Sequence, residues 1–435
     1  MKFTAAGDAI IQRRIQSDFE GYEELAPFIQ RGDGRFFNLE TTLNYEGDCF
    51  ASQFSGGTYI RTNPEVLDDL KEFGFNMTSF NNNHAMDFSY EGLLDTIDYV
   101  DESGLVHSGV GRNLDEASAP KYLETKNGRV ALISVNSTFN PAMMAGVQAR
   151  RVKGRPGING LRVESKFTVS KEEMEFIKLL AKKTNVNASN EIIRAEGYLA
   201  ELPEDQAEFG ALKFSVGEKT EEIKYINEAD VERVIKSIEA ASFSADYVMV
   251  SVHSHQLSGN RKESPSQFLQ DFAHRCIDAG AHAIVGHGPH LLRPIEIYKE
   301  CPIFYSLGDF ILELYNVELA PEDFYDKYGM NSQSSAYELL KKRSKNFTVG
   351  LMEDRRMFTS VIPYWETKDG KLTKLELMPI EMKMDGNKSE NGLPRKATDI
   401  DYFDAFIKDC ADFGTKIEKK ADEFWKLFFN NGERK

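Results

Sequence analysis

Cysteines, basic residues and long apolar runs are all scarce in this chain of 435 residues. The four cysteines lie far apart without a Cys-x-x-Cys pair, which argues against a disulfide framework and a zinc knuckle and suits a reducing cytoplasm. Lysine and arginine number 53 against 69 aspartates and glutamates, so the net charge of −16 disfavours nucleic acid and anionic membrane surfaces as partners. No apolar run approaches the length of a membrane-spanning helix, so we expect none.

The amino-terminal residues are typical of a strand and not of a targeting segment. Met1 is followed directly by a short strand pattern from Lys2 to Asp8, with neither a basic region nor a long apolar region. We therefore expect no signal peptide and a cytoplasmic protein. Hydrophobic residues make up 41% of the chain, which is enough for one large or two ordinary domains.

Strand patterns and helix patterns alternate along most of the chain. Apolar residues recur at helical spacing within 64–73, 90–103 and 266–279, between short runs that are apolar on both faces. Such runs are typical of strands buried between helices, so the pattern predicts an α/β fold. The more alternating stretch at 346–379 predicts antiparallel strands that complete a second sheet. The apolar runs end at Asp8, Asn38, Phe80, Val135, Val252, Val285 and Ser306.

Two regions lie outside this alternation. Within a single domain expected at 1–400, residues 139–232 carry a charged amphipathic helix pattern at 171–183 and a mixed acidic stretch, so we expect them to form an insertion over the active site. Residues 401–435 form a tail whose apolar residues recur at helical spacing from 401 to 428, which predicts a packed carboxy-terminal helix.

Histidine is also rare, and its distribution is the most informative feature of the chain. Five of the eight histidines fall in three short clusters, each directly after a predicted strand. The segment Gly-His-Gly-Pro-His at 286–290 sets two imidazoles three positions apart after an apolar run, where open α/β sheets place their ligands. The alternation of an extended chain directs both rings of His253-Ser254-His255 to one face. The five histidines are His84, His253, His255, His287 and His290.

Carboxylate and amide side chains follow other strands of the same predicted sheet. Asp8 ends the first strand, Glu40 follows the second, and the run Asn81–His84 follows the third, with Asp87 three residues later. Taken singly, each is more typical of a turn former, a helix cap or a satisfied polar group. Their convergence at several strand ends predicts one or two bound divalent metal ions. A ligand set without thiolate suits Mn, Fe, Zn, Mg or Ca.

These motifs also occur in a family-specific order: Gly7-Asp8, Asn38-Leu39-Glu40, Asn82-Asn83-His84 with Asp87, His253, Gly286-His287-Gly288-Pro289-His290 and Ser306-Leu307-Gly308-Asp309-Phe310. The ordered set resembles the CapA family of poly-γ-glutamate capsule-synthesis proteins, a branch of the calcineurin-like metallophosphoesterase superfamily. The resemblance runs from about Phe3 to Phe310. It implies a four-layer α-β-β-α sandwich, in which two sheets pack together with helices outside, and a two-metal centre at the strand ends.

The resemblance further implies roles for individual residues. His84 would be the general acid, and Asp87 and His255 are the other candidate catalytic residues. Asp8 and His290 would bind one metal, Asn83, His253 and His287 would bind the other, and Glu40 would bridge the two.

Two departures from the superfamily pattern weaken a simple phosphatase assignment. The first motif, usually Asp-x-His, is here Asp8-Ala9-Ile10, and the bridging aspartate is replaced by Glu40. One metal therefore loses an imidazole, which lowers its affinity or favours a harder ion. His255 is a candidate replacement ligand, or else a group that contacts the substrate or supports a ligand.

Three functions remain open from the sequence. The favoured one is a metal-dependent hydrolase in which a metal-activated water attacks a phosphoester, amide or γ-glutamyl bond of a small-molecule or peptide substrate. The second is peptide epimerisation, because some relatives share a segment like Gly154–Gly157 and because His84 and His255 could exchange an α-proton. The third is an accessory role in capsule assembly. The oligomeric state is left open.

Overall fold

The computed structural model describes residues 1–331, 333–385, 387–419 and 424–428. The chain divides into two compact units, which we describe separately. Unit 1 comprises 1–160 and 232–435, and unit 2 comprises 161–231. Within the described ranges, no helix is both long and apolar enough to cross a membrane.

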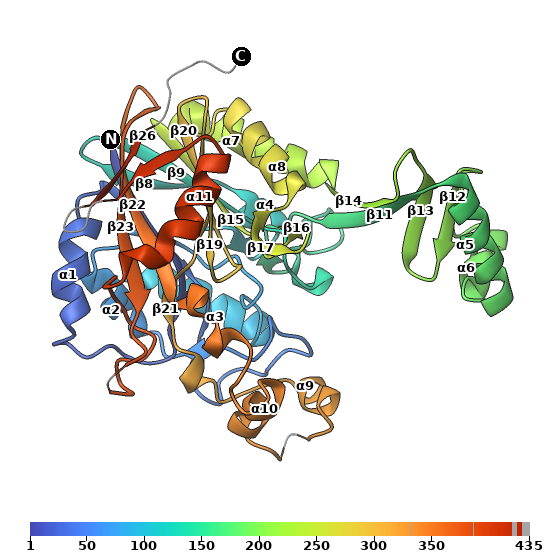
Figure 1. The fold of residues 1–435 in the computed structure, drawn as a ribbon, viewed down its shortest axis with the longest axis horizontal. Helices are drawn as coiled ribbons and strands as arrows, with labels where there is room; N and C mark the ends of the chain where they lie inside the picture. Colours follow the sequence, from blue (N-terminus) through green and yellow to red (C-terminus); the bar gives the residue numbers. More distant parts are fainter. Residues whose placement is uncertain (332, 386, 420–423, 429–435) are drawn as a thin grey trace. The chain divides into compact units, whose positions relative to one another are not determined.

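The first large sheet of unit 1 has ten strands and contains the amino-terminal strand near its middle (Figure 1). The strands β1 (Lys2–Ile10), β2 (Gly34–Leu39), β5 (Met77–Ser79) and β6 (Val106–Ser108) pair in parallel. On the other side of β1 lie the antiparallel strands β22 (Thr359–Lys368) and β23 (Lys371–Met382), and β21 (Asp309–Leu312) also pairs with β1. The late antiparallel strands therefore extend the sheet of β1, whereas the sequence pattern predicted that they complete a second sheet.

The second large sheet has six strands in the order β19-β20-β18-β15-β9-β8. Its central strands β9 (Gly128–Asn136), β15 (Tyr247–His253), β18 (Ala283–His287) and β20 (Cys301–Leu307) are parallel. The strands β8 (Lys121–Thr125) and β19 (Leu292–Tyr298) close the edges in antiparallel pairing. The central strands β15, β18 and β20 are buried along their whole length, as their unbroken apolar runs predict.

The two large sheets pack face to face through a shared apolar core. Phe3 of β1 stacks on Tyr247 of β15 with ring centroids 4.1 Å apart. Trp365 of β22 donates a hydrogen bond of 2.9 Å from its indole nitrogen to the Tyr247 hydroxyl. The opposite face of the first sheet shares a second core with helices α1 (Glu20–Ile29), α2 (Val66–Glu72) and α3 (Ser89–Ser103). Helix α8 (Gln267–Asp278) connects β15 to β18 and packs against β18.

Short elements complete unit 1. They are β3 (Thr42–Leu43), β4 (Arg61–Thr62), β7 (Val110–Gly111), α4 (Leu114–Ser118), β10 (Gly157–Ile158), β16 (Leu257–Ser258), β17 (Arg261–Pro265), α9 (Glu322–Lys327), α10 (Ala336–Arg343) and β24 (Pro394–Lys396). Helix α7 (Glu228–Ser244) begins in unit 2 and continues into unit 1.

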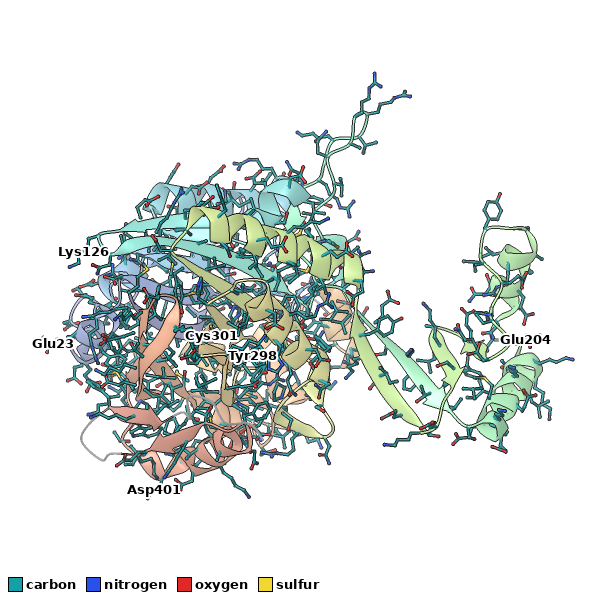
Figure 2. All side chains as sticks on the ribbon, turned by 90° about the horizontal axis from the view of Figure 1, so that it is seen from above. Glu23, Lys126, Glu204, Tyr298, Cys301 and Asp401 are labelled. Carbon is teal, nitrogen blue, oxygen red and sulfur yellow. The ribbon has the colours of Figure 1, made fainter. Side chains whose placement is uncertain are left out.

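Unit 2 is a small sheet with helices. Its strands are ordered β12 (Gln206–Phe209), β13 (Leu212–Val216), β11 (Val163–Val169) and β14 (Glu221–Ile226). The amphipathic pattern at 171–183 forms α5 (Lys171–Thr184), which is followed by α6 (Ala188–Ala195). Most side chains of this unit are solvent-exposed, among them Glu204 (Figure 2). The separate unit begins at 161, because residues 139–160 cluster with unit 1. The expected position of the insertion over the active site stays a prediction.

The carboxy-terminal tail is helical over only part of the predicted range. Helix α11 covers Asp404–Asp412 and ends before Gly414, whose φ of 80° breaks the helix. The chain then forms β25 (Lys416–Glu418) and β26 (Trp425–Phe428), and β26 pairs with β23. The prediction of a single helix over 401–428 is therefore wrong beyond residue 412. Trp425 and Leu427 are both buried, at the two-residue spacing of a strand. Residues 420–423 and 429–435 of the tail lie outside the described residues.

Candidate metal centre

The carboxyl ends of strands from both large sheets meet at one place. In the first sheet, Asp8 lies opposite Asn38 of β2 and Asp309 of β21. In the second sheet, His253 at the end of β15 lies opposite His287 at the end of β18. The loops after these strands add the remaining predicted residues. The structure thus gathers all six predicted ligands, Asp8, Glu40, Asn83, His253, His287 and His290, in one buried cluster.

Within this cluster, three groups of side chains hold their ligand atoms within 4.8 Å of one another. The groups are Asp8 with His253 and His287, Glu40 with His253 and His255, and Asp8 with His290 and Asp309. Neighbouring ligand atoms around a divalent ion are separated by roughly 3.0–3.4 Å when each lies about 2.1 Å from the ion. The spacing in the cluster is therefore close to that of a metal coordination shell.

His287 shows how a neighbouring side chain fixes a ligand. The Ser251 hydroxyl lies 2.7 Å from His287 Nε2, which leaves Nδ1 facing the cluster. That Nδ1 lies 3.4 Å from Asp8 Oδ1 and 3.0 Å from His253 Nδ1. Asp8 is held in turn by the Asn38 amide, which donates to Oδ1 at 2.7 Å, and by the Gly288 N–H, which donates to Oδ2 at 2.8 Å.

The second group crosses between the two sheets. His253 Nε2 lies 2.6 Å from Asn83 Oδ1, 3.0 Å from His255 Nε2 and 3.8 Å from Glu40 Oε1. Burial, followed by the charge of His255, places the pKa of His253 well below its usual range. Burial and the charge of His290 lower the pKa of His255 to about 3. Both rings are therefore neutral at physiological pH, which is the form that offers a lone pair to a cation.

His290 and Asp309 form the third group. His290 Nδ1 lies 3.0 Å from Asp309 Oδ1 and 3.8 Å from Asp8 Oδ2. The Gly-His-Gly-Pro-His turn achieves this through left-handed backbone at Gly288, with φ of 114°, and at His290, with φ of 58°. A Cβ at Gly288 would come within 3.1 Å of the His253 ring, so glycine allows the turn to pass close to the cluster.

Glu40 is a buried carboxyl group without a hydrogen-bond partner among the described residues. It is fully buried, and among the described residues neither of its carboxylate oxygens has a hydrogen-bond donor. Burial and the nearby charges of Asp8 and Asp309 raise the pKa of Glu40 well above its usual range. A carboxylate placed in this way is costly unless a cation neutralises it. The residues present therefore fit a divalent cation.

His84 and Asp87 form a separate pair at the edge of the cluster. His84 Nδ1 lies 2.7 Å from Asp87 Oδ2, and Asp87 also accepts from the N–H groups of Ile60 at 2.9 Å and Gly56 at 3.2 Å. This arrangement fixes the His84 ring and, among the described residues, leaves Nε2 without a hydrogen-bond partner. His84, His255 and His290 line one pocket of about 180 Å³.

Two residues of the site were not predicted from the sequence. Asp309 lies in the last of the family motifs but was not predicted as a ligand, although it lies opposite Asp8 and contacts His290. Ser251 was not considered, although strand alternation places it on the same face as His253, two positions later. The alternation on β15 was the available signal for Ser251.

Comparisons with known proteins agree with the family resemblance. A family model for the bacterial capsule synthesis protein PGA_cap matches residues 2–313. An uncharacterized protein of Sinorhizobium fredii, y4sH, is 31% identical over 431 residues, which cover 95% of this chain and 90% of that protein. The capsule biosynthesis protein CapA of Bacillus anthracis is 24% identical over 319 residues, or 72% of this chain and 60% of that protein. A probable polyglutamine synthesis accessory protein of Mycobacterium tuberculosis is 24% identical over 274 residues, or 63% of this chain and 54% of that protein.

Proposed function

We propose that this chain, which belongs to the bacterial capsule synthesis protein family PGA_cap, is a metal-dependent hydrolase. The proposal is based on its buried cluster of carboxylates and imidazoles. The capsule-related names of its Bacillus relatives favour an amide or γ-glutamyl bond as the target, with a phosphoester as the alternative. The substrate is a small molecule or peptide. We further propose that the two packed sheets and their helices form the four-layer sandwich of the metallophosphoesterase type.

One observation carries the proposal. Glu40 is a fully buried carboxylate that has no donor among the described residues, and it lies beside two further carboxylates, Asp8 and Asp309. Three acidic groups in one buried place need positive charge. Imidazole nitrogens of His253 and His290 lie 3.8 and 3.9 Å from Glu40 Oε1, so one or two divalent cations satisfy the whole set.

The residues of the site have two proposed roles, as metal ligands and as a proton donor. The proposed ligands are Asp8, Glu40, Asn83, His253, His287 and His290, with His255 and Asp309 beside them. A bound divalent pair would lower the pKa of a water molecule toward neutrality and would stabilise developing negative charge on the substrate. Asp87 holds the His84 ring so that Nε2 can protonate the leaving group.

A second function, epimerisation of a peptide residue, is favoured by a different observation. His84 and His255 line the same pocket, so two imidazoles could take and return an α-proton on the two sides of one substrate carbon. Hydrolysis yields two fragments, whereas proton exchange leaves the peptide intact. A protein with only an accessory role would neither cleave the substrate nor exchange its α-proton.

Heavy water separates the three functions. Mn²⁺-loaded protein is incubated in heavy water with a γ-glutamyl peptide, a phosphodiester and a pool of ordinary peptides, and the products are analysed by mass spectrometry. Metal-dependent cleavage of the γ-glutamyl peptide or the phosphodiester supports the hydrolase. Deuterium at one α-carbon of an intact peptide, dependent on metal and on His84, replaces it with the epimerase. A loaded protein that does neither has the accessory role.

A further inference from the structure

We propose that the pocket beside the strand-end histidines selects a substrate that carries a free carboxylate next to an apolar side chain, with Arg343 binding the carboxylate. The inference rests on the proposed function, because it names the substrate class of the same site. It makes Arg343 and the apolar wall around it the determinants of specificity.

The wall of this pocket comes from a part of the chain beyond the family match. His84, His255 and His290 line it from within the matched region that ends at residue 313. Further lining residues come from 314–352, a range that includes α10. The apolar side chains of this wall are Leu314, Val317, Leu340, Val349, Leu351 and Met352. The family model thus covers the strand-end histidines of the pocket but not this segment.

Arg343 is the cationic side chain at the pocket, where it ends α10. Its guanidinium lies 5.4 Å from the centroid of the Phe324 ring, which holds it by a cation–π contact. No carboxylate in the described part of the chain forms an ion pair with it. In a protein with a net charge of −16, an arginine without a carboxylate beside an active-site pocket is suited to an anionic ligand group.

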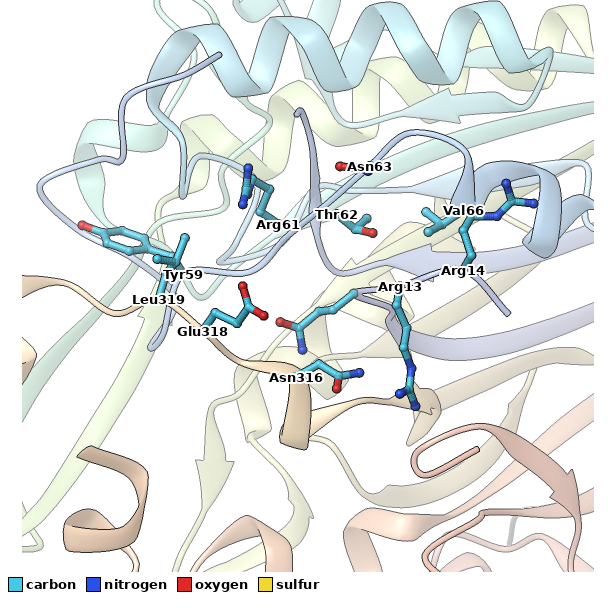
Figure 3. A pocket seen from close by; sticks show the side chains of 11 residues that line it. Arg13, Arg14, Tyr59, Arg61, Thr62, Asn63, Val66, Asn316, Glu318 and Leu319 are labelled. Carbon is cyan, nitrogen blue, oxygen red and sulfur yellow. The ribbon is translucent and has the colours of Figure 1, made fainter. Parts of the chain in front are cut away.

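The arginines of a neighbouring pocket provide the contrast (Figure 3). Arg13 lies 2.6 Å from the buried carboxylate of Glu313, and Arg14 lies 2.7 Å from that of Asp69. The positive charges of both arginines are therefore balanced by carboxylates of the protein itself. Arg61 lies 3.9 Å from an exposed carboxylate. The segment 58–62, which ends in β4, separates the two pockets, since Thr58 and Ile60 line the histidine pocket while Tyr59 and Arg61 line this one.

The size and the lining of the histidine pocket restrict the ligand. Its volume of about 180 Å³ is small, since typical ligand pockets hold roughly 300–1,000 Å³. A group of one or two residues fits better than a polymer segment. A polyanion would also place carboxylates against the apolar wall, where they lose hydration without a partner. One carboxylate at Arg343 and one apolar side chain at the wall satisfy both features.

Binding to a protein that holds metal but does not turn over tests the inference. The His84→Ala protein loaded with Mn²⁺ is titrated by calorimetry with γ-glutamyl-leucine, γ-glutamyl-leucinamide and γ-glutamyl-glycine. We expect γ-glutamyl-leucine to bind roughly tenfold or more tightly than the amide, because a hydrogen-bonded charge contact is worth about 1.5–3 kcal/mol. We expect a similar advantage over γ-glutamyl-glycine from burial of the leucine side chain.

Two further variants assign these preferences to residues. Arg343→Gln should lower the affinity for γ-glutamyl-leucine to that for its amide, whereas Lys341→Gln, the same charge change on α10 away from the pocket, should leave it unchanged. Val349→Asn, at a side chain that is 44% exposed, should reduce the leucine-to-glycine preference without changing the carboxylate preference. Equal binding of all three compounds, no binding of any, or an unchanged carboxylate preference in Arg343→Gln would overturn the inference. Wild-type cleavage of γ-glutamyl compounds is scored separately, so the proposed function can fail or stand independently.

Discussion

His253 ends a strand of one large sheet and Asn83 lies in the turn after a strand of the other, yet His253 Nε2 lies 2.6 Å from Asn83 Oδ1. His253 ends β15 of the second sheet, and Asn83 follows β5 of the first, 170 residues away in the chain. The proposed ligands are thus divided between the two sheets. A bound cation would therefore tie the sheets together at their carboxyl ends, and metal binding and stability should be linked.

The first prediction concerns metal content. Combining His287→Ala with His290→Ala should remove most of the bound metal, because it deletes two imidazoles from overlapping ligand groups. The matched control is His274→Ala. His274 lies on α8, outside the cluster, and contacts Glu296 of β19. Elemental analysis after loading with Mn²⁺ measures the difference, and circular dichroism checks that both variants are folded. Equal loading of the double variant and the control would exclude the cluster as the metal site.

The second prediction compares the effect of Glu40 on the stability of the metal-free protein with its effect on metal binding. Glu40→Gln should leave the metal-free protein at least as stable as wild type, because it replaces a buried carboxyl group whose ionisation beside Asp8 and Asp309 is unfavourable, as its raised pKa shows. The same change should weaken metal binding, so Mn²⁺ should raise the melting temperature less than in wild type.

Glu313→Gln is the opposing control, since that carboxylate is also fully buried but is paired with Arg13 at 2.6 Å. Its removal leaves a charge without its partner and should destabilise the protein with and without metal. Thermal unfolding of both variants, with and without Mn²⁺, gives the four values. A metal-free Glu40→Gln protein that melts below wild type would show that Glu40 is stabilised by other means.

The strand ends that form the cluster could be predicted from the sequence because their signals are local. Each ligand ends an apolar run or lies in the loop just after one, and parallel strands bring their carboxyl ends to one edge. Asp309 was harder to assign, because its role depends on the pairing of β21 with β1, which lies three hundred residues earlier in the chain. A contact of that range leaves no periodic pattern in the sequence.

The carboxy-terminal tail shows a different limit of sequence reasoning. The spacing of Phe403, Phe406 and Cys410 is helical and does form α11 and the turn before it. Beyond Gly414, the short apolar runs fit a helix or a strand equally well. The free edge of β23 decides between them, because β26 pairs with it and buries Trp425.

The third prediction uses two adjacent glycines. A Cβ at Gly56 would lie 2.3 Å from Asn83 Nδ2 and 2.6 Å from His84 Nε2, whereas a Cβ at Gly57 would meet no atom within 4 Å. Gly56→Ala should therefore displace a proposed ligand and the proposed general acid, with a loss of turnover of at least tenfold. Gly57→Ala should retain wild-type turnover. Steady-state kinetics on the cleaved substrate compare the two, and equal activity would show that Asn83 and His84 can move without cost.

The last prediction concerns proton transfer by His84. His84→Ala should retain bound metal and lose turnover by about 10²–10⁴, the usual contribution of a general acid. Asp87→Asn should also retain metal and lose turnover, because it removes the carboxylate 2.7 Å from His84 Nδ1 that fixes the tautomer and the orientation of the ring. Asp8→Ala should lose metal and turnover together, since Asp8 belongs to two of the three ligand groups. A substrate with a good leaving group, such as a γ-glutamyl anilide with an electron-withdrawing substituent, needs little protonation and should restore part of the activity of His84→Ala but not of Asp8→Ala. If the activated anilide rescues neither variant, or rescues both equally, His84 does not act as the acid.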